Sequence, residues 1–302
     1  MLTFFLAIVD CTSSVLYIPY MSSISSTFLV SHLVGQSLSG LIPSFLALAQ
    51  GVGGNPDCVN STTNEVSPIE PRYSVNVFFL LLTVLAVISW IAFFCLQNLK
   101  RFFNINVSSN IDKLDDYTSD QSLYLVNRMS SKTILILLIT EGSICSMTNG
   151  ILPSIQPYSV LVYGNISHHF VVTLSAIASA MGTYLSLFLN RRQAIVLPLS
   201  LIIAVLSSGY IIASAMTSPN RLITNGFGSF FIVLVWISNN LMFSFSRATI
   251  TRLLRSQKQA HKYLFLGGVF TQIGSFIGAI LMFCIINYTQ TFISYQPCDE
   301  KK

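Results

Sequence analysis

Long apolar stretches separated by polar segments run through almost the whole chain. A helix that spans a bilayer needs about 20 predominantly apolar residues. On that criterion the sequence predicts eight membrane spans, at residues 2–21, 26–50, 74–97, 131–153, 167–189, 194–216, 227–248 and 262–286. We therefore expect an all-α polytopic membrane protein with about eight transmembrane helices.

The polar segments predict three parts. Residues 1–97 form a three-helix membrane segment with an external loop at 51–73, and residues 131–302 form a five-helix membrane segment with an external carboxy-terminal tail. Between them, residues 98–130 are rich in Asn, Asp, Ser and Lys and too polar to pack as a core. We interpret this stretch as a cytoplasmic tether, with a phosphorylation or sorting role as the alternative.

Composition supports the membrane class. Apolar residues make up 52% of the chain, charged residues only 9%, and the mean hydropathy is +0.67, whereas soluble domains carry about 25% charged residues. The net charge of +5 does not indicate a nucleic-acid partner, because the basic residues gather in one set of loops. The lipid bilayer is the partner that this composition predicts.

The distribution of Lys and Arg predicts the orientation. Of the 16 basic residues, 12 fall in the segments 98–132, 190–193 and 247–262, which alternate onto one face of the membrane. Basic loops stay on the cytoplasmic side, so residues 98–132 are expected to be cytoplasmic and the carboxy terminus extracellular.

The opposite face carries the glycosylation sequon at Asn60 and two cysteines in polar segments, Cys58 and Cys298. An oxidising, glycosylating compartment suits both features. We expect glycosylation of Asn60 and a disulfide between Cys58 and Cys298. The same alternation places Met1 outside, which led us to expect a missing amino-terminal portion, as in a truncated gene, a splice form or a partial chain.

Asp10 places a carboxylate in the middle of the first apolar stretch. An ionised carboxylate at the bilayer centre costs roughly 2.5 to 3.5 kcal/mol, so it must face protein or water. Asp10 therefore either belongs to a solute pathway or pairs with a neighbouring helix. Ser13 and Ser14 follow it, although small residues also allow close helix packing. Glu141 is a second carboxylate within an expected span.

The fourth span ends in a stretch, residues 148–164, that contains Gly150, Pro153 and Pro157. These residues disturb helical hydrogen bonding, and irregular backbone at membrane depth occurs where it is buried in protein or lines a cavity. A cavity wall or its external mouth is one interpretation, and an ordinary helix end with a Pro-rich turn is the other. The polar residues that would line such a cavity are Asn149, Gln156, Tyr158 and Tyr163.

The last span contains Gly274 and Gly278, a spacing typical of close helix packing. Gln272 on the same span is a candidate polar lining residue. The sequence shows no close pair of cysteines with the spacing of a metal site, and no nucleophile paired with a base. We expect no cofactor, no metal and no enzymatic activity.

Four motifs together resemble one known family. They are DCTSSVLYIPYM at 10–21, the GxxLSGLxP…ALAQG pattern from Gly35 to Gly51, TNGILPSIQPYS…YG at 148–164 and QxGSxxGAxLMF at 272–283. In this order they resemble the eukaryotic riboflavin transporters, solute carrier family 52. The resemblance implies an eleven-helix plasma-membrane carrier that takes up riboflavin by alternating access, of which this chain would supply helices four to eleven and lack the first three.

The resemblance also implies a substrate chemistry. Riboflavin is a flat, uncharged tricycle with a uracil-like edge and a hydroxylated ribityl tail. Amides at Asn149 and Gln156 suit the imide edge, Tyr158 and Tyr163 can stack or hydrogen-bond, and Asp10, Ser13 and Ser14 can accept from ribityl hydroxyls. Gln36 stands where the family has a glutamate, so proton coupling through that carboxylate does not carry over. The alternatives are a truncated, non-transporting membrane receptor or regulatory fragment of the carrier, and, with less support, a membrane-embedded enzyme.

Overall fold

The structure is a computed structural model in which most of the second half of the chain is described. The described residues are 12, 15–16, 35–36, 39–51, 58–60, 65–66, 71–102, 129–186, 188, 193–223, 226–257, 259–289 and 291–293. Within these ranges the elements are helical apart from one small antiparallel hairpin, β1 (Cys58–Asn60) and β2 (Glu65–Val66).

Five described helical segments are long and apolar enough to cross a membrane. They are Val75–Cys95, Ser131–Tyr163, Ile195–Met216, Phe227–Arg255 and Ala260–Tyr288. Helix α8 (Asn165–Leu185) matches the span expected at 167–189 but is less apolar than these five. Of the span expected at 26–50, the structure describes α3 (Leu41–Gln50) and a few residues before it, and almost all of 2–21 lies outside the described residues. The chain is a multi-pass membrane protein.

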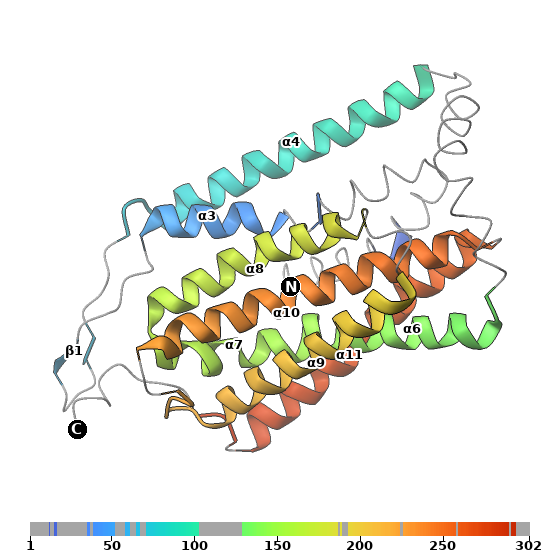
Figure 1. The fold of residues 1–302 in the computed structure, drawn as a ribbon. Coiled ribbons are helices and arrows are strands. Elements are labelled where there is room, and N and C mark those ends of the chain that lie inside the picture. The colour runs from blue at the N-terminus through green and yellow to red at the C-terminus, as the bar shows by residue number, and fades with distance from the viewer. Residues whose placement is uncertain are drawn as a thin grey trace.

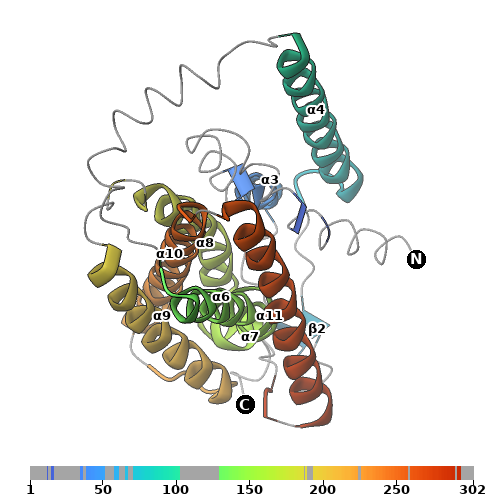
Figure 2. The ribbon, with the colours of Figure 1, turned by 90° about the vertical axis from the view of Figure 1, so that its right-hand side faces the viewer.

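Most of the helices form one bundle. It contains α6 (Ser131–Cys145), α7 (Leu152–Val160), α8, α9 (Gln193–Met216), α10 (Phe227–Arg255) and α11 (Ala260–Tyr288). Helix α10 packs against α8 and α9, while α11 packs along α6, and α7 packs against α9. Helix α4 (Val75–Phe102) stands apart from this bundle, with α3 between them (Figures 1 and 2).

Glycines allow the backbones of α6 and α11 to touch. A Cβ on Gly274 would lie 1.9 Å from the carbonyl oxygen of Gly142, and a Cβ on Gly278 would lie 2.4 Å from that of Ser146. A Cβ on Gly150 would likewise lie 2.6 Å from the carbonyl carbon of Gly278. The close packing predicted from Gly274 and Gly278 is therefore confirmed, and the facing residues follow the same four-residue spacing on α6 and its continuation.

The stretch at 148–164 changes its helical geometry without leaving the helix. Between α6 and α7 the backbone forms the π-helical turn η1 (Ser146–Ile151), and after α7 it tightens into the 3₁₀ turn η2 (Leu161–Tyr163). Pro153 is the second residue of α7 and has no backbone N–H to donate to the preceding η1 turn. A π-helical turn is rare and is often found at functional sites. The disturbed backbone was thus predicted correctly, but its form was not.

The basic helix ends gather at one end of the bundle. The carboxy end of α10 and the amino ends of α6 and α11 lie there, and the carboxy end of α4, apart from the bundle, lies on the same side (Figure 1). The loop expected at 247–262 is shorter than predicted, because α10 continues to Arg255 and α11 begins at Ala260. The assignment of Arg247 to that loop is wrong, because Arg247 lies inside α10.

Candidate solute-binding site

A cavity of about 420 Å³ lies between α3, the η1–α7 segment, α8 and α10. Its size falls within the range of roughly 300 to 1,000 Å³ typical of small-molecule sites. The lining residues are Gln36, Ser39, Gly40, Ser44, Thr148, Leu152, Pro153, Gln156, Val172, Ser175, Ala176, Ser179, Trp236 and Asn240.

Helical spacing explains why these residues meet. Thr148, Leu152 and Gln156 recur every four positions, so they share one face of the η1–α7 segment. Val172, Ala176 and Ser179, spaced by four and then three positions, share one face of α8, as Trp236 and Asn240, four positions apart, do on α10. The cavity is therefore lined by whole helix faces, which hold its polar groups in fixed positions.

The lining combines amides, hydroxyls and apolar surface, and none of the lining residues in the described part of the chain is charged. Gln36, Gln156 and Asn240 each carry a carboxamide that can both donate and accept hydrogen bonds. Leu152 and the indole of Trp236 are buried apolar parts of the lining, and Pro153 is exposed. Such a lining suits an uncharged solute with several hydrogen-bonding groups.

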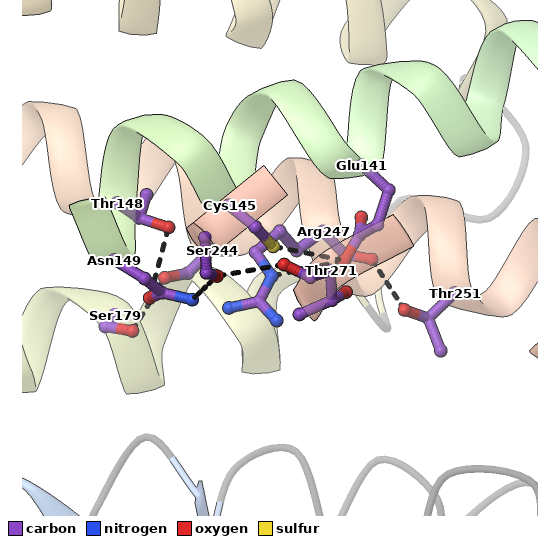
Figure 3. A network of polar contacts seen from close by, with 10 residues as sticks. Glu141, Cys145, Thr148, Asn149, Ser179, Ser244, Arg247, Thr251 and Thr271 are labelled. Atoms are coloured by element: carbon purple, nitrogen blue, oxygen red, sulfur yellow. Dashed lines mark hydrogen bonds and ion pairs between the residues drawn. The ribbon is translucent and has the colours of Figure 1, made fainter. Parts of the chain in front are cut away.

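Two of the sequence-predicted residues, Gln36 and Gln156, line the cavity. Asn149 lies next to it: its Oδ1 is 3.5 Å from the hydroxyl of the lining residue Thr148, and its Nδ2 donates to Ser275 Oγ on α11 at 2.9 Å. The amide of Asn149 thus joins η1 to α11 at the edge of the cavity (Figure 3).

The other predicted residues in the described part of the chain lie elsewhere. The ring of Tyr158 packs against Phe292 with centroids 5.5 Å apart. Tyr163 is buried, and its hydroxyl accepts from the backbone N–H of Ile223 at 3.3 Å, at the end of the bundle. Gln272 is partly buried on α11 and is not among the lining residues.

Several predictions fall outside the described residues. Asp10, Ser13, Ser14 and Cys298 are not described, and Cys58 and Asn60 are described only as backbone of β1.

Sequence reasoning missed the contributions of α8 and α10. Ser175 and Ser179 resembled ordinary small packing residues, and Trp236 resembled an ordinary apolar residue of a span. Asn240 offered a usable signal, because two consecutive asparagines, Asn239 and Asn240, stand within a long apolar stretch. Polar side chains in such a position face protein or a cavity.

A polar network lies beside the cavity (Figure 3). Arg247 Nε of α10 donates to Glu141 Oε1 of α6 at 3.2 Å, and Cys145 Sγ lies 4.0 Å from the same oxygen. Nearer the cavity, the hydroxyls of Ser179 and Ser244 lie 2.6 Å apart and join α8 to α10. Glu141, whose place in the sequence suggested no partner, is therefore one half of an ion pair.

Fold and cavity together define a polytopic helical membrane protein with an uncharged, solute-sized site between its helices. The chain belongs to solute carrier family 52, the riboflavin transporters, whose family model matches residues 1–294. The chain is 31% identical over 336 residues to the Danio rerio protein "Solute carrier family 52, riboflavin transporter, member 3-A", covering 99% of this chain and 74% of that one.

Two further relatives show similar agreement. The Homo sapiens member 3 of the family is 31% identical over 360 residues, covering 99% of this chain and 76% of the relative. The Caenorhabditis elegans "Riboflavin transporter rft-1" is 32% identical over 321 residues, covering 99% and 74% respectively. No solved structure matches the chain.

Proposed function

We propose that this protein carries riboflavin across the plasma membrane into the cell by alternating access. The observation that carries the proposal is the uncharged cavity, lined by three carboxamides, by hydroxyls and by an indole. Its relatives are named riboflavin transporters, and its family is one of transporters rather than enzymes.

The cavity matches riboflavin group by group. The uracil-like edge of the isoalloxazine ring presents both donors and acceptors, as do the carboxamides of Gln36, Gln156 and Asn240. Hydroxyls from Thr148, Ser175 and Ser179 suit the ribityl tail. The hydroxyls of Thr148 and Ser179 also contact Asn149 and Ser244 within the bundle.

The proposal includes a topology of eight spans that correspond to helices four to eleven of the family's eleven, in the three parts expected above: 1–97, 98–130 and 131–302. Residues 98–132 face the cytoplasm and the carboxy terminus is extracellular, so the hairpin β1–β2 is external. Asn60 is then available for glycosylation, and Cys58 can pair with Cys298. Asp10, Ser13, Ser14 and Asn149 complete the polar surface near the substrate.

Uptake of radiolabelled riboflavin by proteoliposomes that contain the purified 302-residue chain tests this function. We expect saturable uptake that excess unlabelled riboflavin abolishes and that empty liposomes do not show. Binding of riboflavin by equilibrium dialysis, measured on the same preparation, separates recognition from movement. Binding without uptake would contradict transport and favour the non-transporting receptor, and absence of both would contradict the substrate as well.

A further inference from the structure

Helix α10, which lines the cavity, and helix α6, which continues into the lining η1–α7 segment, carry opposite charges at matching sequence distances from lining residues. Glu141 precedes the lining residue Thr148 by seven positions, and Arg247 follows the lining residue Asn240 by seven. Seven residues are about two helical turns, or roughly 10 Å. Both charges are therefore displaced along their helices from the cavity, toward the end of the bundle that carries Arg252 and Arg255.

Glu141 and Arg247 form an ion pair toward that end of the bundle, in which Glu141 is buried and Arg247 is half-buried. The Nε–Oε1 distance is 3.2 Å, and the side chain of Glu141 is 6% exposed while that of Arg247 is 28% exposed. Cys145 and Thr271 surround the carboxylate (Figure 3), and Glu141 Oε2 has no hydrogen-bond partner among the described residues. An unpaired charge at this depth is costly. Each of the two side chains therefore stabilises the conformation in which the other is within ion-pair distance.

The pair joins two units that are each tightly packed internally. In one unit, α6 and η1 lie against α11 through Gly142, Gly274 and Gly278. In the other, α8 lies against α10 through Gly182, where a Cβ would meet the carbonyl oxygen of Leu241 at 2.3 Å. Contacts as close as these leave little room for sliding within either unit.

We propose that the Glu141–Arg247 pair is a latch that closes the cavity at the end of the bundle with the basic residues, and that it must separate whenever the cavity opens there. The solute that then passes is the one assigned under the proposed function, and the inference rests on that function only for the solute's identity. Closure itself is a property of the two units and is measurable without any solute.

Cys145 is a natural reporter of this opening. Its side chain is fully buried, one turn from Glu141 on the same helix. We would expose the purified full chain to N-ethylmaleimide and follow each cysteine by peptide mass spectrometry. Cys95 is exposed on α4, away from the latch, and serves as the internal reference. In Glu141→Gln and in Arg247→Gln we expect alkylation of Cys145 to be roughly tenfold faster than in the parent chain, with Cys95 unchanged.

Two further variants separate a latch from a general loss of folding. Ala215→Cys introduces a thiol at a fully buried position near the opposite end of the bundle, and it should remain protected when combined with either neutral variant. The exchanged pair, Glu141→Arg with Arg247→Glu, should restore the slow alkylation of Cys145.

Each other outcome overturns the inference. Unchanged alkylation of Cys145 in the neutral variants would show that the pair does not hold the end closed. Equal acceleration at Cys145 and at the cysteine placed at 215 would show unfolding rather than opening. Failure of the exchanged pair to restore protection would show that the charge pairing is not what matters. Because no riboflavin is used, a failed transport assay would leave this result unaffected.

Discussion

Asn239 and Asn240 are neighbours in α10 but face different surroundings. Asn239 is fully buried, and its Nδ2 lies 2.9 Å from the carbonyl oxygen of Ala204 and 2.7 Å from Ser208 Oγ, both on α9. Asn240 lines the cavity, and its Nδ2 donates within its own helix, to the carbonyl oxygen of Trp236 at 3.0 Å. One amide therefore holds two helices together, and the other is available to a solute.

This difference predicts opposite effects for one substitution at adjacent positions. Asn239→Ala removes a contact between α9 and α10, and interhelical hydrogen bonds in membranes contribute about 0.6 to 2 kcal/mol. We expect a lower thermal unfolding midpoint in detergent for this variant. Asn240→Ala should leave the midpoint near that of the parent and weaken riboflavin binding instead. The assignment fails if both variants lose stability equally while binding is unchanged in the folded fraction.

Two glutamines give a matched test of the cavity. Gln156 lines it, whereas Gln272 is a partly buried glutamine on α11 that does not. Loss of a hydrogen bond to a buried solute costs about 1 to 3 kcal/mol, so Gln156→Ala should weaken riboflavin binding by roughly one to two orders of magnitude. Gln272→Ala should bind as the parent does. Equilibrium dialysis of both variants with riboflavin, at equal concentrations of folded protein, tests this prediction. Equal riboflavin affinities of the two variants would remove Gln156 from the site.

At the scale of elements, glycine placement sets how closely the helices approach. A methyl group on Gly274 would overlap the carbonyl oxygen of Gly142, whereas nothing lies within 4 Å of the same position at Gly209 on α9. Gly274→Ala should therefore force α11 away from α6 and sharply reduce the monodisperse fraction on size-exclusion chromatography. Gly209→Ala should have no such effect, since alanine is no worse than glycine in an open helical position. Normal behaviour of Gly274→Ala would contradict the close approach.

Comparison of elements also shows what sequence patterns could predict. The spacing of Gly274 and Gly278 predicted tight packing, because two small residues four positions apart lie on the same face of one helix and this can be seen without knowing the partner helix. A cavity wall was one of two interpretations of the stretch at 148–164, beside an ordinary helix end, and Gln156 of that stretch lines a cavity. The π-helical turn was not predicted, because Gly150, Pro153 and Pro157 indicate a disturbed helix but not its hydrogen-bonding pattern. Arg247 was misassigned because a basic residue near the end of a span looks like a loop residue until its partner Glu141 is known.

At the scale of the whole molecule, apolar side chains face outward in a way that a bilayer explains. The apolar window of α4 has no buried residues, and Phe79, Trp90 and Phe94 are all more than half exposed. Exposure of this kind would be costly in water but costs little in lipid. The helix ends that carry basic residues then mark a single membrane face (Figure 1).

The orientation of that face can be tested directly. Without Arg247, which lies inside α10, eleven of the 16 basic residues belong to the segments 98–132, 190–193 and 248–262, and basic segments are retained in the cytoplasm. An epitope inserted between residues 115 and 116 should therefore be reached by antibody only after cells are permeabilised, whereas an epitope after Lys302 should be reached on intact cells. Each tagged protein must still fold, which size-exclusion chromatography of the solubilised protein checks. If the carboxy-terminal epitope is detected only after permeabilisation, the orientation is inverted, and the Glu141–Arg247 pair would then close the external end of the cavity.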